Sequence, residues 1–433
     1  MVSIWTESAR MPHFPALEGN AKTEVLIIGG GITGILCAYF LQQKGVDYLL
    51  VEGRTICSGV TENTTAKITA QHCLIYDKLL QSIGMERAQM YLEANQYAVN
   101  TYFELCSGID CDFEEKTACV YAMDDRKKLE RETAALWKLG FPAKLIETTE
   151  LPFPTAGAVS FGHQAQFHPL KFLSRIAENL TICEHTFVKE LSAHTAVTEK
   201  GSIHFQKLIF ATHFPIDNKH GMYFMKLYQH RSYVIALEHA PTLPAMYIDE
   251  AQNGLSFRSY QELLLIGGGS HRTGKTGGSW QELRSFATEH YPEAREKYAW
   301  ATQDCMSLDG IPYIGRYSKR MPECFVATGF SKWGMTSAMA AAMILSDLVT
   351  GEENCYAPVF DPSRNMLKPQ LFINLCESAA GLLSLSKKRC PHLGCALKWN
   401  AAEHSWDCSC HGSRFDAEGT LLNNPANGNL KTP

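Results

Sequence analysis

The sequence has no long run of like charges, no internal repeat and no low-complexity segment. Lys and Arg number 40 and Asp and Glu 45, so the net charge is −5 and the composition favours neither nucleic acid nor an anionic lipid surface as a partner. Residues 1–24 lack a continuous apolar segment, which argues against a secretory signal and predicts a cytoplasmic location. The composition is typical of globular proteins, and 433 residues predict roughly two to four domains.

Long hydrophobic segments are also scarce. Residues 25–43 carry no charge over almost the length of a membrane-spanning helix. Glycines at 29, 30, 31 and 34 interrupt this segment and favour a strand, a tight turn and a helix. We therefore expect no membrane insertion.

Cysteine is plentiful, with 15 residues, but the number is odd and the residues are spread along the chain. Without a secretory signal, this pattern argues against a disulfide scaffold and favours metal or redox use near the C-terminus, where several cysteines cluster. We interpret most of the others as reduced structural thiols: Cys37, Cys57, Cys73, Cys106, Cys111, Cys119, Cys183, Cys324, Cys355 and Cys376.

Gly29-x-Gly31-x-x-Gly34 lies between an apolar segment typical of a buried strand and a helical pattern. The first glycine permits a tight turn, the second lets the backbone approach a pyrophosphate, and the third allows close packing of helix on strand. Glu52 lies 18 residues after Gly34, at the end of a second expected strand, where a carboxylate binds ribose hydroxyls. The motif predicts a dinucleotide site and leaves FAD and NAD open. A glycine-rich turn needed only for packing is the alternative.

Strand-like and helix-like segments continue to residue 364. We expect helices at 77–89, 124–139 and 334–349. We expect strands at 25–28, 47–52, 117–122, 207–212, 223–238, 245–248, 255–260, 263–267 and 324–329.

Several segments resemble the D-amino acid oxidase-like family of FAD-dependent oxidoreductases, which includes glycine oxidase and sarcosine oxidase. They are the Ser/Gly-rich loop 58–67, the segment Glu184-x-Thr-x-Val188, the strand 208–212 and, most specifically, 308–315 with 326–336. His213 departs from the pattern, because many relatives have glycine there. The resemblance implies that FAD is bound, by Gly29, Gly31, Gly34, Glu52, Thr65, Val188, Gly329, Phe330, Trp333, Gly334, Met335 and Thr336.

The C-terminal segment contains Cys390-x-His392 and, after 15 intervening residues, Cys408-x-x-His411. A tetrahedral zinc site uses the same types of ligand. The spacing resembles a Rieske [2Fe–2S] domain, which implies that the two cysteines bind one iron and the two histidines the other.

The resemblance to Rieske domains includes two more cysteines, but the segment before the first cluster ligand is shorter than in that family. Cys395 and Cys410 occupy positions that form a disulfide between the cluster loops of respiratory Rieske proteins. Only 25 residues separate Arg364 from Cys390, fewer than Rieske domains use to build the sheet under these loops. We expect a shortened domain in which packing on the FAD domain replaces the missing sheet, or a cluster that is labile.

Few catalytic residues are expected, because hydride transfer to a flavin needs orientation more than a protein acid. Lys67 follows the flavin loop, where relatives place a basic residue near the ring. Arg258 lies in mid-strand, where it would clamp a substrate carboxylate. A surface lysine and an exposed strand arginine are the alternatives. Lys332 and Trp333 would shape the active-site face, unless the tryptophan is simply buried structure.

One cysteine and four histidines remain. Cys305 precedes Met306 in a context similar to a sarcosine oxidase segment that carries a covalent flavin, but a buried small hydrophobe is favoured. The histidines have no metal-site spacing and stay without a role: His72, His168, His213 and His271.

The resemblance implies an α/β plus α+β fold. A Rossmann-like FAD-binding domain would hold an inserted substrate domain with an antiparallel sheet, followed by a small, shortened, all-β Rieske-type domain. We divide the chain into FAD-binding segments 1–75, 153–215 and 301–364, substrate-domain segments 76–152 and 216–300, and a Rieske domain 365–433.

As a whole the chain resembles oxidoreductases of the glycine oxidase and gamma-glutamylputrescine oxidoreductase type that carry a C-terminal Rieske domain. This implies a dehydrogenase that oxidises a C–N bond of a small amine or amino acid and passes electrons from FAD through the cluster to an unknown one-electron acceptor. The built-in relay favours a dehydrogenase over an H₂O₂-producing oxidase. Two alternatives stay open: a non-catalytic flavin or iron–sulfur redox sensor, and a reductase fed by NADH, for which a second glycine fingerprint is missing.

Overall fold

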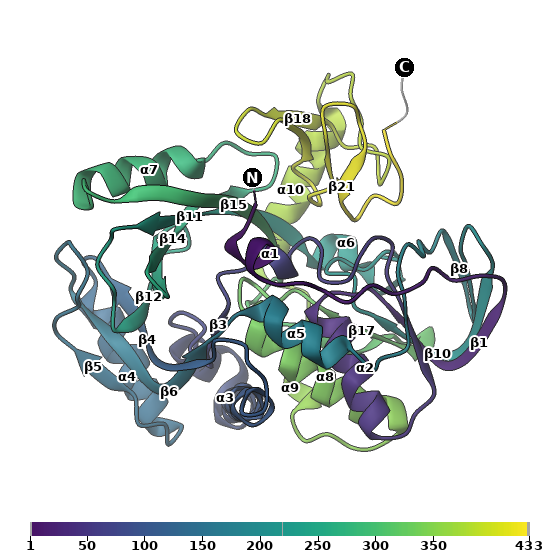
Figure 1. Ribbon diagram of the computed structural model, residues 1–433, viewed down its shortest axis with the longest axis horizontal. Helices are drawn as coiled ribbons and strands as arrows, with labels where there is room; N and C mark the ends of the chain where they lie inside the picture. Colours follow the sequence, from purple (N-terminus) through teal and green to yellow (C-terminus); the bar gives the residue numbers. More distant parts are fainter. Residues whose placement is uncertain (1, 219, 431–433) are drawn as a thin grey trace.

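The structure is a computed structural model that describes residues 2–218 and 220–430. Within these residues the strands form an eight-stranded, a nine-stranded and a four-stranded sheet. In Figure 1 the four-stranded C-terminal sheet, in yellow, lies on one side of the body that the two larger sheets build. The expected fold class is confirmed.

The eight-stranded sheet has the order β16-β17-β10-β1-β2-β7, and β9 pairs with β10 and β8. β1 runs parallel to β2 and β10, so that these strands end together at one edge. Ligands of α/β folds bind at such carboxyl ends. The strands are β1 (Ala21–Ile28), β2 (Tyr48–Val51), β7 (Ile182–Cys183), β8 (Glu190–Ser192), β9 (Thr195–Val197), β10 (Ser202–Phe210), β16 (Tyr313–Ser318) and β17 (Met321–Thr328).

Two apolar helices accompany this sheet, α2 (Ile32–Gln43) and α8 (Gly334–Thr350), which pack against each other. Both begin at the turns that the sequence singled out, because α2 starts after Gly31 and α8 starts at Gly334. The shorter helices nearby are α5 (Pro169–Ala177) and α9 (Ala357–Phe360).

The nine-stranded sheet has the order β15-β11-β14-β13-β12-β4-β6-β3, with β5 beside β6. Its pairs are antiparallel except for β4 with β12. The strands are β3 (Lys67–Ile68), β4 (Glu114–Ala122), β5 (Lys144–Ile146), β6 (Gly157–Gln166), β11 (Tyr228–Glu238), β12 (Ala245–Asp249), β13 (Ser256–Tyr260), β14 (Leu263–Arg272) and β15 (Arg295–Met306). The helices α3 (Tyr76–Cys106), α4 (Arg126–Lys138) and α7 (Ser279–His290) belong to the same part of the chain.

Three details differ from the sequence-based expectations. β6 pairs with β4, so residues 157–166 belong to the substrate sheet and not to the second FAD-binding segment, and β15 extends that sheet to Met306. The helix expected at 77–89 continues through a kink at Gly84 to Cys106. The strand expected from 223 begins only at Tyr228, because Tyr223–Lys226 form a helical turn, α6, that Lys226 ties to the Pro362 carbonyl.

The C-terminal sheet has the order β18-β19-β20-β21, with β18 (Leu397–Asn400), β19 (Ser405–Cys408), β20 (Arg414–Phe415) and β21 (Leu421–Asn423). The helix α10 (Pro369–Leu383) fills the short connection before it. The Gly381 carbonyl accepts a hydrogen bond from Ala396 N, and a Cβ on Gly381 would lie 2.5 Å from Cys410 Sγ. The shortened domain is therefore supported by α10 and, as described below, by the substrate sheet.

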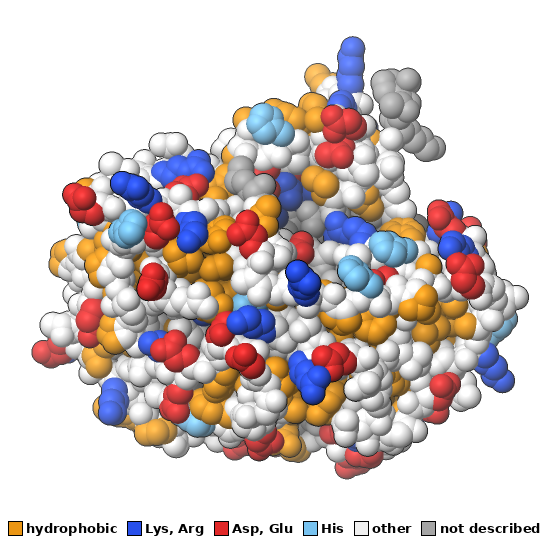
Figure 2. Space-filling model, in the orientation of Figure 1, with side chains coloured by type: hydrophobic (Ala, Val, Ile, Leu, Met, Phe, Trp, Pro, Cys, Tyr) orange, Lys and Arg blue, Asp and Glu red, His pale blue; other side chains and the backbone are white. Residues whose placement is uncertain are grey.

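The remaining helix, α1 (Ile4–Ser8), buries Trp5 near the start of the chain. Among the described residues, none of the helices combines the length and apolar character that a membrane crossing needs. The face of the molecule in Figure 2 carries acidic and basic side chains interspersed, with no large field of one sign.

Candidate functional site

A cavity of about 1150 Å³ lies between the two larger sheets, at the carboxyl ends of β1 and β2. It exceeds the usual volume of pockets for drug-sized ligands, about 300–1,000 Å³. Its wall contains residues of both sheets and also residues 421–424 and 426–429 of the C-terminal domain. A dinucleotide is the size of ligand that such a cavity suits.

The glycine turn forms one end of this cavity. Gly29 has φ +112°, and a Cβ there would lie 2.6 Å from the Ala211 carbonyl oxygen. A Cβ on Gly34 would lie 1.9 Å from the Gly29 oxygen, which explains the third glycine as a packing requirement. Gly29 and Gly31 line the cavity, whereas Gly34 supports it from behind. This arrangement leaves the N-terminus of α2 open to a phosphate.

The end of β2 supplies the acidic residue. The Glu52 carboxylate accepts hydrogen bonds from Gly30 N at 2.7 Å and Arg54 N at 2.9 Å, and it lines the cavity. Val188 lies in the wall beyond β7. Glu184, in the same segment, is buried and accepts a hydrogen bond from Ile56 N at 2.7 Å, which holds the loop after β2.

The loop before β3 brings Thr65 and Lys67 to the cavity. Burial, together with the charge of Arg258, lowers the pKa of Lys67 to about 7. Among the described residues, Lys67 Nζ contacts Ser256 Oγ at 3.4 Å and Thr65 Oγ1 at 3.5 Å, both long for hydrogen bonds. This ammonium group is therefore available to a ligand.

Arg258 does not have the position expected of a substrate clamp. Its side chain is absent from the cavity wall and fully buried, and Nη1 donates to the carbonyls of Thr65 at 2.6 Å and Ala66 at 2.7 Å. Burial lowers the pKa of Arg258 to about 9. Arg258 therefore holds this loop through Nη1, while its Nε and Nη2 are buried without a hydrogen-bond partner among the described residues.

The segment that begins at Gly329 lies across the cavity. Gly329, Phe330, Trp333, Gly334 and Met335 line it. Trp333 stacks on His72 with ring centroids 4.9 Å apart, which fixes the plane of the indole.

Thr336 and His72 support this segment, Thr336 from behind the cavity wall and His72 from within it. Thr336 is not in the wall, since its Oγ1 accepts from Thr69 N at 3.1 Å and donates to Thr69 O at 2.8 Å. His72 bonds Tyr91 Oη at 2.6 Å, and burial lowers the pKa of this imidazole to about 3. His72 thus has a structural role that its sequence context did not indicate.

Sequence reasoning named Lys332 but missed the polar residues of the substrate sheet beside it. Lys332 Nζ donates to Ser270 Oγ at 3.1 Å, Ser270 Oγ bonds Ser232 Oγ at 3.2 Å, and Ser232 Oγ donates to Asp304 at 3.0 Å. All four residues line the cavity. Burial raises the pKa of Asp304 and lowers the pKa of Lys332. Polar residues inside otherwise apolar strands were the available signal.

Cys305 and His213 also lie in the cavity wall. Burial raises the pKa of the Cys305 thiol to about 12, so it is neutral, as a buried structural cysteine is. Burial lowers the pKa of His213 to about 4, and its Nε2 is buried without a hydrogen-bond partner among the described residues.

A second site lies in the C-terminal domain. The Cys408 thiol donates to Cys390, which lowers the pKa of Cys390 to about 7. The rings of His392 and His411 are perpendicular with centroids 4.9 Å apart. Two sulfurs and two imidazoles therefore meet at the ends of two loops, as the spacing predicts.

The donor set fits an iron–sulfur cluster. Both ring nitrogens of His411 are buried and lack hydrogen bonds of ordinary geometry within the described chain. Burial lowers the pKa of His411 to about 3, and a neutral imidazole is the form that ligates a metal. The Cys395 and Cys410 sulfurs form a disulfide that joins the two loops, and Cys408 Sγ lies within 4.8 Å of both. Since the disulfide consumes two sulfurs, those of Cys390 and Cys408 are the ones left in these loops for a cluster.

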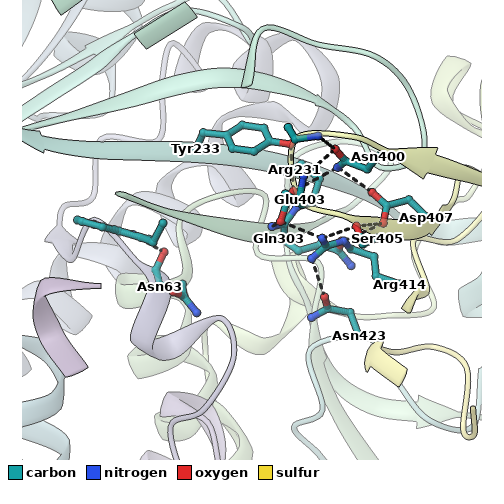
Figure 3. A network of polar contacts seen from close by, with 12 residues as sticks. Asn63, Arg231, Tyr233, Gln303, Asn400, Glu403, Ser405, Asp407, Arg414 and Asn423 are labelled. Carbon is teal, nitrogen blue, oxygen red and sulfur yellow. Dashed lines mark hydrogen bonds and ion pairs between the residues drawn. The ribbon is translucent and has the colours of Figure 1, made fainter. Parts of the chain in front are cut away.

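A polar network fastens the C-terminal domain to the substrate sheet (Figure 3). Arg231 forms a two-pronged ion pair with Glu403, and Tyr233 Oη donates to the same carboxylate at 3.0 Å. Arg414 bonds Glu403 at 2.8 Å and Asp407 at 3.0 Å from the other side. Burial alone would raise the pKa of Glu403, but Arg231 and Arg414 outweigh it and lower the pKa to about 2.

Comparison with known proteins agrees with both sites. The model of the FAD dependent oxidoreductase family (DAO) matches residues 24–348, and that of the Rieske [2Fe-2S] domain matches residues 366–433. The protein is a DAO-family oxidoreductase with a Rieske domain. The two matches identify FAD and a [2Fe–2S] cluster as the cofactors, which excludes the zinc alternative.

Relatives of this oxidoreductase share its whole length or its fold. YhfW of Bacillus subtilis, whose name describes a Rieske 2Fe-2S iron–sulfur protein, is 35% identical and matches 99% of this chain and 97% of its own. The match runs over 492 positions, so at least 59 of them have no counterpart among the 433 residues here.

Solved structures show the fold. L-proline dehydrogenase from P. horikoshii superposes with a TM-score of 0.68 at 19% identity, covering 80% of this chain and 98% of that one. Glycine oxidase from Geobacillus kaustophilus has a TM-score of 0.67 at 20% identity, covering 80% and 99%.

Proposed function

We propose that this oxidoreductase is a dehydrogenase that oxidises a C–N bond of a small amine or amino acid and passes the electrons through its Rieske cluster to a one-electron acceptor. The observation that carries the proposal is the position of the C-terminal domain, whose residues 421–424 and 426–429 complete the wall of the FAD cavity. A cluster domain that forms part of the cavity wall favours electron transfer from FAD to the cluster over electron transfer to O₂. The relatives with solved structures support an amino acid or amine as substrate, since their names describe a proline dehydrogenase and a glycine oxidase.

The residues that would hold FAD are those of the cavity wall that the sequence predicted: Gly29, Gly31, Glu52, Thr65, Val188, Gly329, Phe330, Trp333, Gly334 and Met335. Gly34 and Thr336 keep this wall in place. Cys390, His392, Cys408 and His411 would hold the cluster. FAD supplies a two-electron acceptor for hydride, and the cluster supplies a one-electron carrier.

The chain's own contribution to the reaction is to bind and orient. Lys67 and Lys332 place two ammonium groups in the wall, where they attract a substrate carboxylate. Ser270 and Ser232 connect Lys332 to Asp304, which keeps that lysine in position. The stacked pair of Trp333 and His72 gives the substrate a flat apolar boundary. The substrate loses a hydride from carbon and a proton from nitrogen, and water hydrolyses the resulting imine.

The experiment is an anaerobic screen of amino acids and amines against the purified protein, with bleaching of the flavin absorbance as the readout. The reduced protein is then mixed with ferricyanide or with O₂. We expect at least one carboxylate-bearing amine to bleach the flavin, and reoxidation by ferricyanide to be faster than by O₂. Equal reoxidation rates would contradict a dehydrogenase. Bleaching by NADH alone would favour the reductase, and no bleaching by any donor would favour the sensor.

A further inference from the structure

Two buried glutamines of the substrate sheet contact the loop that carries two cluster ligands. Gln229 in β11 donates from Nε2 to the His411 carbonyl at 2.9 Å and to the Asn424 carbonyl at 3.1 Å. Gln303 in β15 donates to Gln229 Oε1 at 2.5 Å and to the Gly412 carbonyl at 2.8 Å. Each glutamine is 1% exposed. The pair therefore forms a buried carboxamide bridge to the loop 408–412.

The loop lies directly on this bridge. Gly412 has φ +87°, and a Cβ there would lie 2.6 Å from Gln229 Cβ and 2.8 Å from its Cγ. The backbone of the loop approaches so closely that no side chain fits between them. The directional hydrogen bonds from the two glutamines and the close contact at Gly412 hold the loop in one place.

The opposite face of the same strand belongs to the FAD cavity. Thr302 and Asp304, the neighbours of Gln303 in β15, line the cavity. Because side chains alternate along a strand, Gln303 points to the other face, where the loop lies. Cys305 is paired with Gln229 in the register of β15 and β11, so it shares the face of the two glutamines, and it also lines the cavity. The glutamine pair is therefore next to residues of the cavity wall on one side and to the cluster loop on the other.

Asn424 forms a second contact between the cavity wall and the C-terminal domain, beside the glutamine bridge. Asn424 Nδ2 donates to the carbonyls of Thr212 at 2.8 Å and Phe214 at 2.6 Å. His213, between these two residues, lines the cavity, and its contact with Gln229 partly offsets the fall in its pKa caused by burial.

We propose that Gln229 and Gln303 are positioning residues for electron transfer, and that their carboxamides hold the cluster loop at a fixed distance from the FAD cavity. The inference rests on the proposed direction of electron flow. Fully reduced FAD holds two electrons and the oxidised cluster accepts one. The first electron therefore leaves the cluster for a one-electron acceptor before the second enters, and the protons of the reduced flavin go to solvent. In this arrangement the Rieske domain stays docked and does not swing between partners.

The test uses the full-length holoprotein and needs no knowledge of the substrate. FAD is reduced by a light flash in the presence of deazaflavin and EDTA, and the appearance of the electron on the cluster is followed by visible absorbance and by EPR after rapid freezing. Gln229→Met and Gln303→Met keep the side-chain length and remove the hydrogen bonds. We expect electron transfer to slow on the order of 10- to 100-fold in each variant, since small displacements of reacting groups cost this much.

Matched glycine variants separate displacement of the loop from simple strain. Gly412→Ala drives a Cβ into Gln229, whereas Gly394→Ala, at φ +77° in the other cluster loop, has no atom within 4 Å of the new Cβ. We expect Gly412→Ala to slow transfer and Gly394→Ala to leave it near the wild-type rate. The EPR g values and the reduction potential of the cluster should stay unchanged in the glutamine variants. Damage to the cluster would change both.

The outcomes distinguish the inference from the function on which it rests. A wild-type protein whose cluster stays oxidised after the flash overturns the relay, and the positioning role with it. Transfer in the wild type that both glutamine variants and Gly412→Ala retain at full rate overturns the positioning role alone. Slow transfer in Gly394→Ala as well as in Gly412→Ala assigns the effect to strain and also overturns it.

Discussion

At the scale of the residue, Lys67 and Arg258 show how the fold separates two candidate cations. The sequence predicts Lys67 near the flavin ring and Arg258 as a clamp for a substrate carboxylate. The structure places Lys67 in the cavity wall and turns Arg258 to two loop carbonyls. Ser256 lies on the same face of β13 as Arg258 and lines the cavity, so the face of the strand does not separate the two cations. The contact of Arg258 with the carbonyls of Thr65 and Ala66 does, and no local pattern predicts that contact. We therefore propose Lys67 as the cation that binds the carboxylate.

A pH dependence follows from the pKa of Lys67, which burial lowers from 10.5 to about 7. The ammonium is present below this pH and lost above it, so we expect KM for a carboxylate-bearing substrate to rise as the pH increases through about 7. Lys67→Arg should flatten this profile because arginine stays charged. Lys67→Met should raise KM about 10- to 150-fold, the cost of a hydrogen bond to a charged group.

The measurement is a set of steady-state profiles with ferricyanide as acceptor, repeated with an amine that lacks a carboxylate. The amine should show no dependence on Lys67. An unchanged KM for the carboxylate-bearing substrate in Lys67→Met would show that Lys67 does not bind this substrate.

At the scale of the element, the network around Glu403 joins β11 to the C-terminal domain. Glu403 is 172 residues from Arg231, so no local pattern in the sequence predicts their contact. The Cys/His spacing and the glycine fingerprint were predictable, because each motif lies within a short segment whose backbone geometry dictates the residue types. The network, the polar group of Asp304 and the glutamine bridge depend on how distant strands meet, and for that reason they were missed.

We expect Glu403→Gln to destabilise the protein by about 3–5 kcal/mol, because it leaves Arg231 and Arg414 buried without their carboxylate. The Glu403 carboxylate stabilises the fold fully above its ordinary pKa of 4.5, and this contribution is lost as the pH falls toward about 2. The difference in unfolding free energy between wild type and variant should therefore shrink over that range. Denaturant unfolding at several pH values measures it.

Glu296→Gln is the matched control. Glu296 in β15 pairs with Arg284 in α7, and both side chains are partly exposed. An ion pair of this kind contributes roughly 0.2–1 kcal/mol, so this variant should unfold almost like the wild type. Equal losses of unfolding free energy in Glu403→Gln and Glu296→Gln would show that the buried network stabilises the fold no more than an exposed ion pair does.

At the scale of the whole molecule, the two cofactor sites should be separable by a single substitution. Cys408→Ser removes one cluster ligand without touching the FAD cavity. We expect this variant to keep FAD, to lose iron and the EPR signal of the cluster, and to be bleached by substrate at the wild-type rate. Its turnover with large one-electron acceptors, such as cytochrome c, should fall far below that of the wild type.

Metal analysis, flavin absorbance and turnover measured on one preparation check this prediction. Cys355→Ser, an exposed cysteine outside both sites, serves as the control and should match the wild type in all three. Turnover with cytochrome c that survives loss of the cluster would show that the acceptor takes electrons from FAD directly.

Residues 421–424 and 426–429 of the C-terminal domain form part of the cavity wall, and this affects how newly made protein acquires its FAD. A flavin held behind these residues enters while the C-terminal domain is still undocked. Docking then closes the cavity. Once docked, these residues also hinder the escape of the flavin, so we expect the folded protein to retain FAD on dilution.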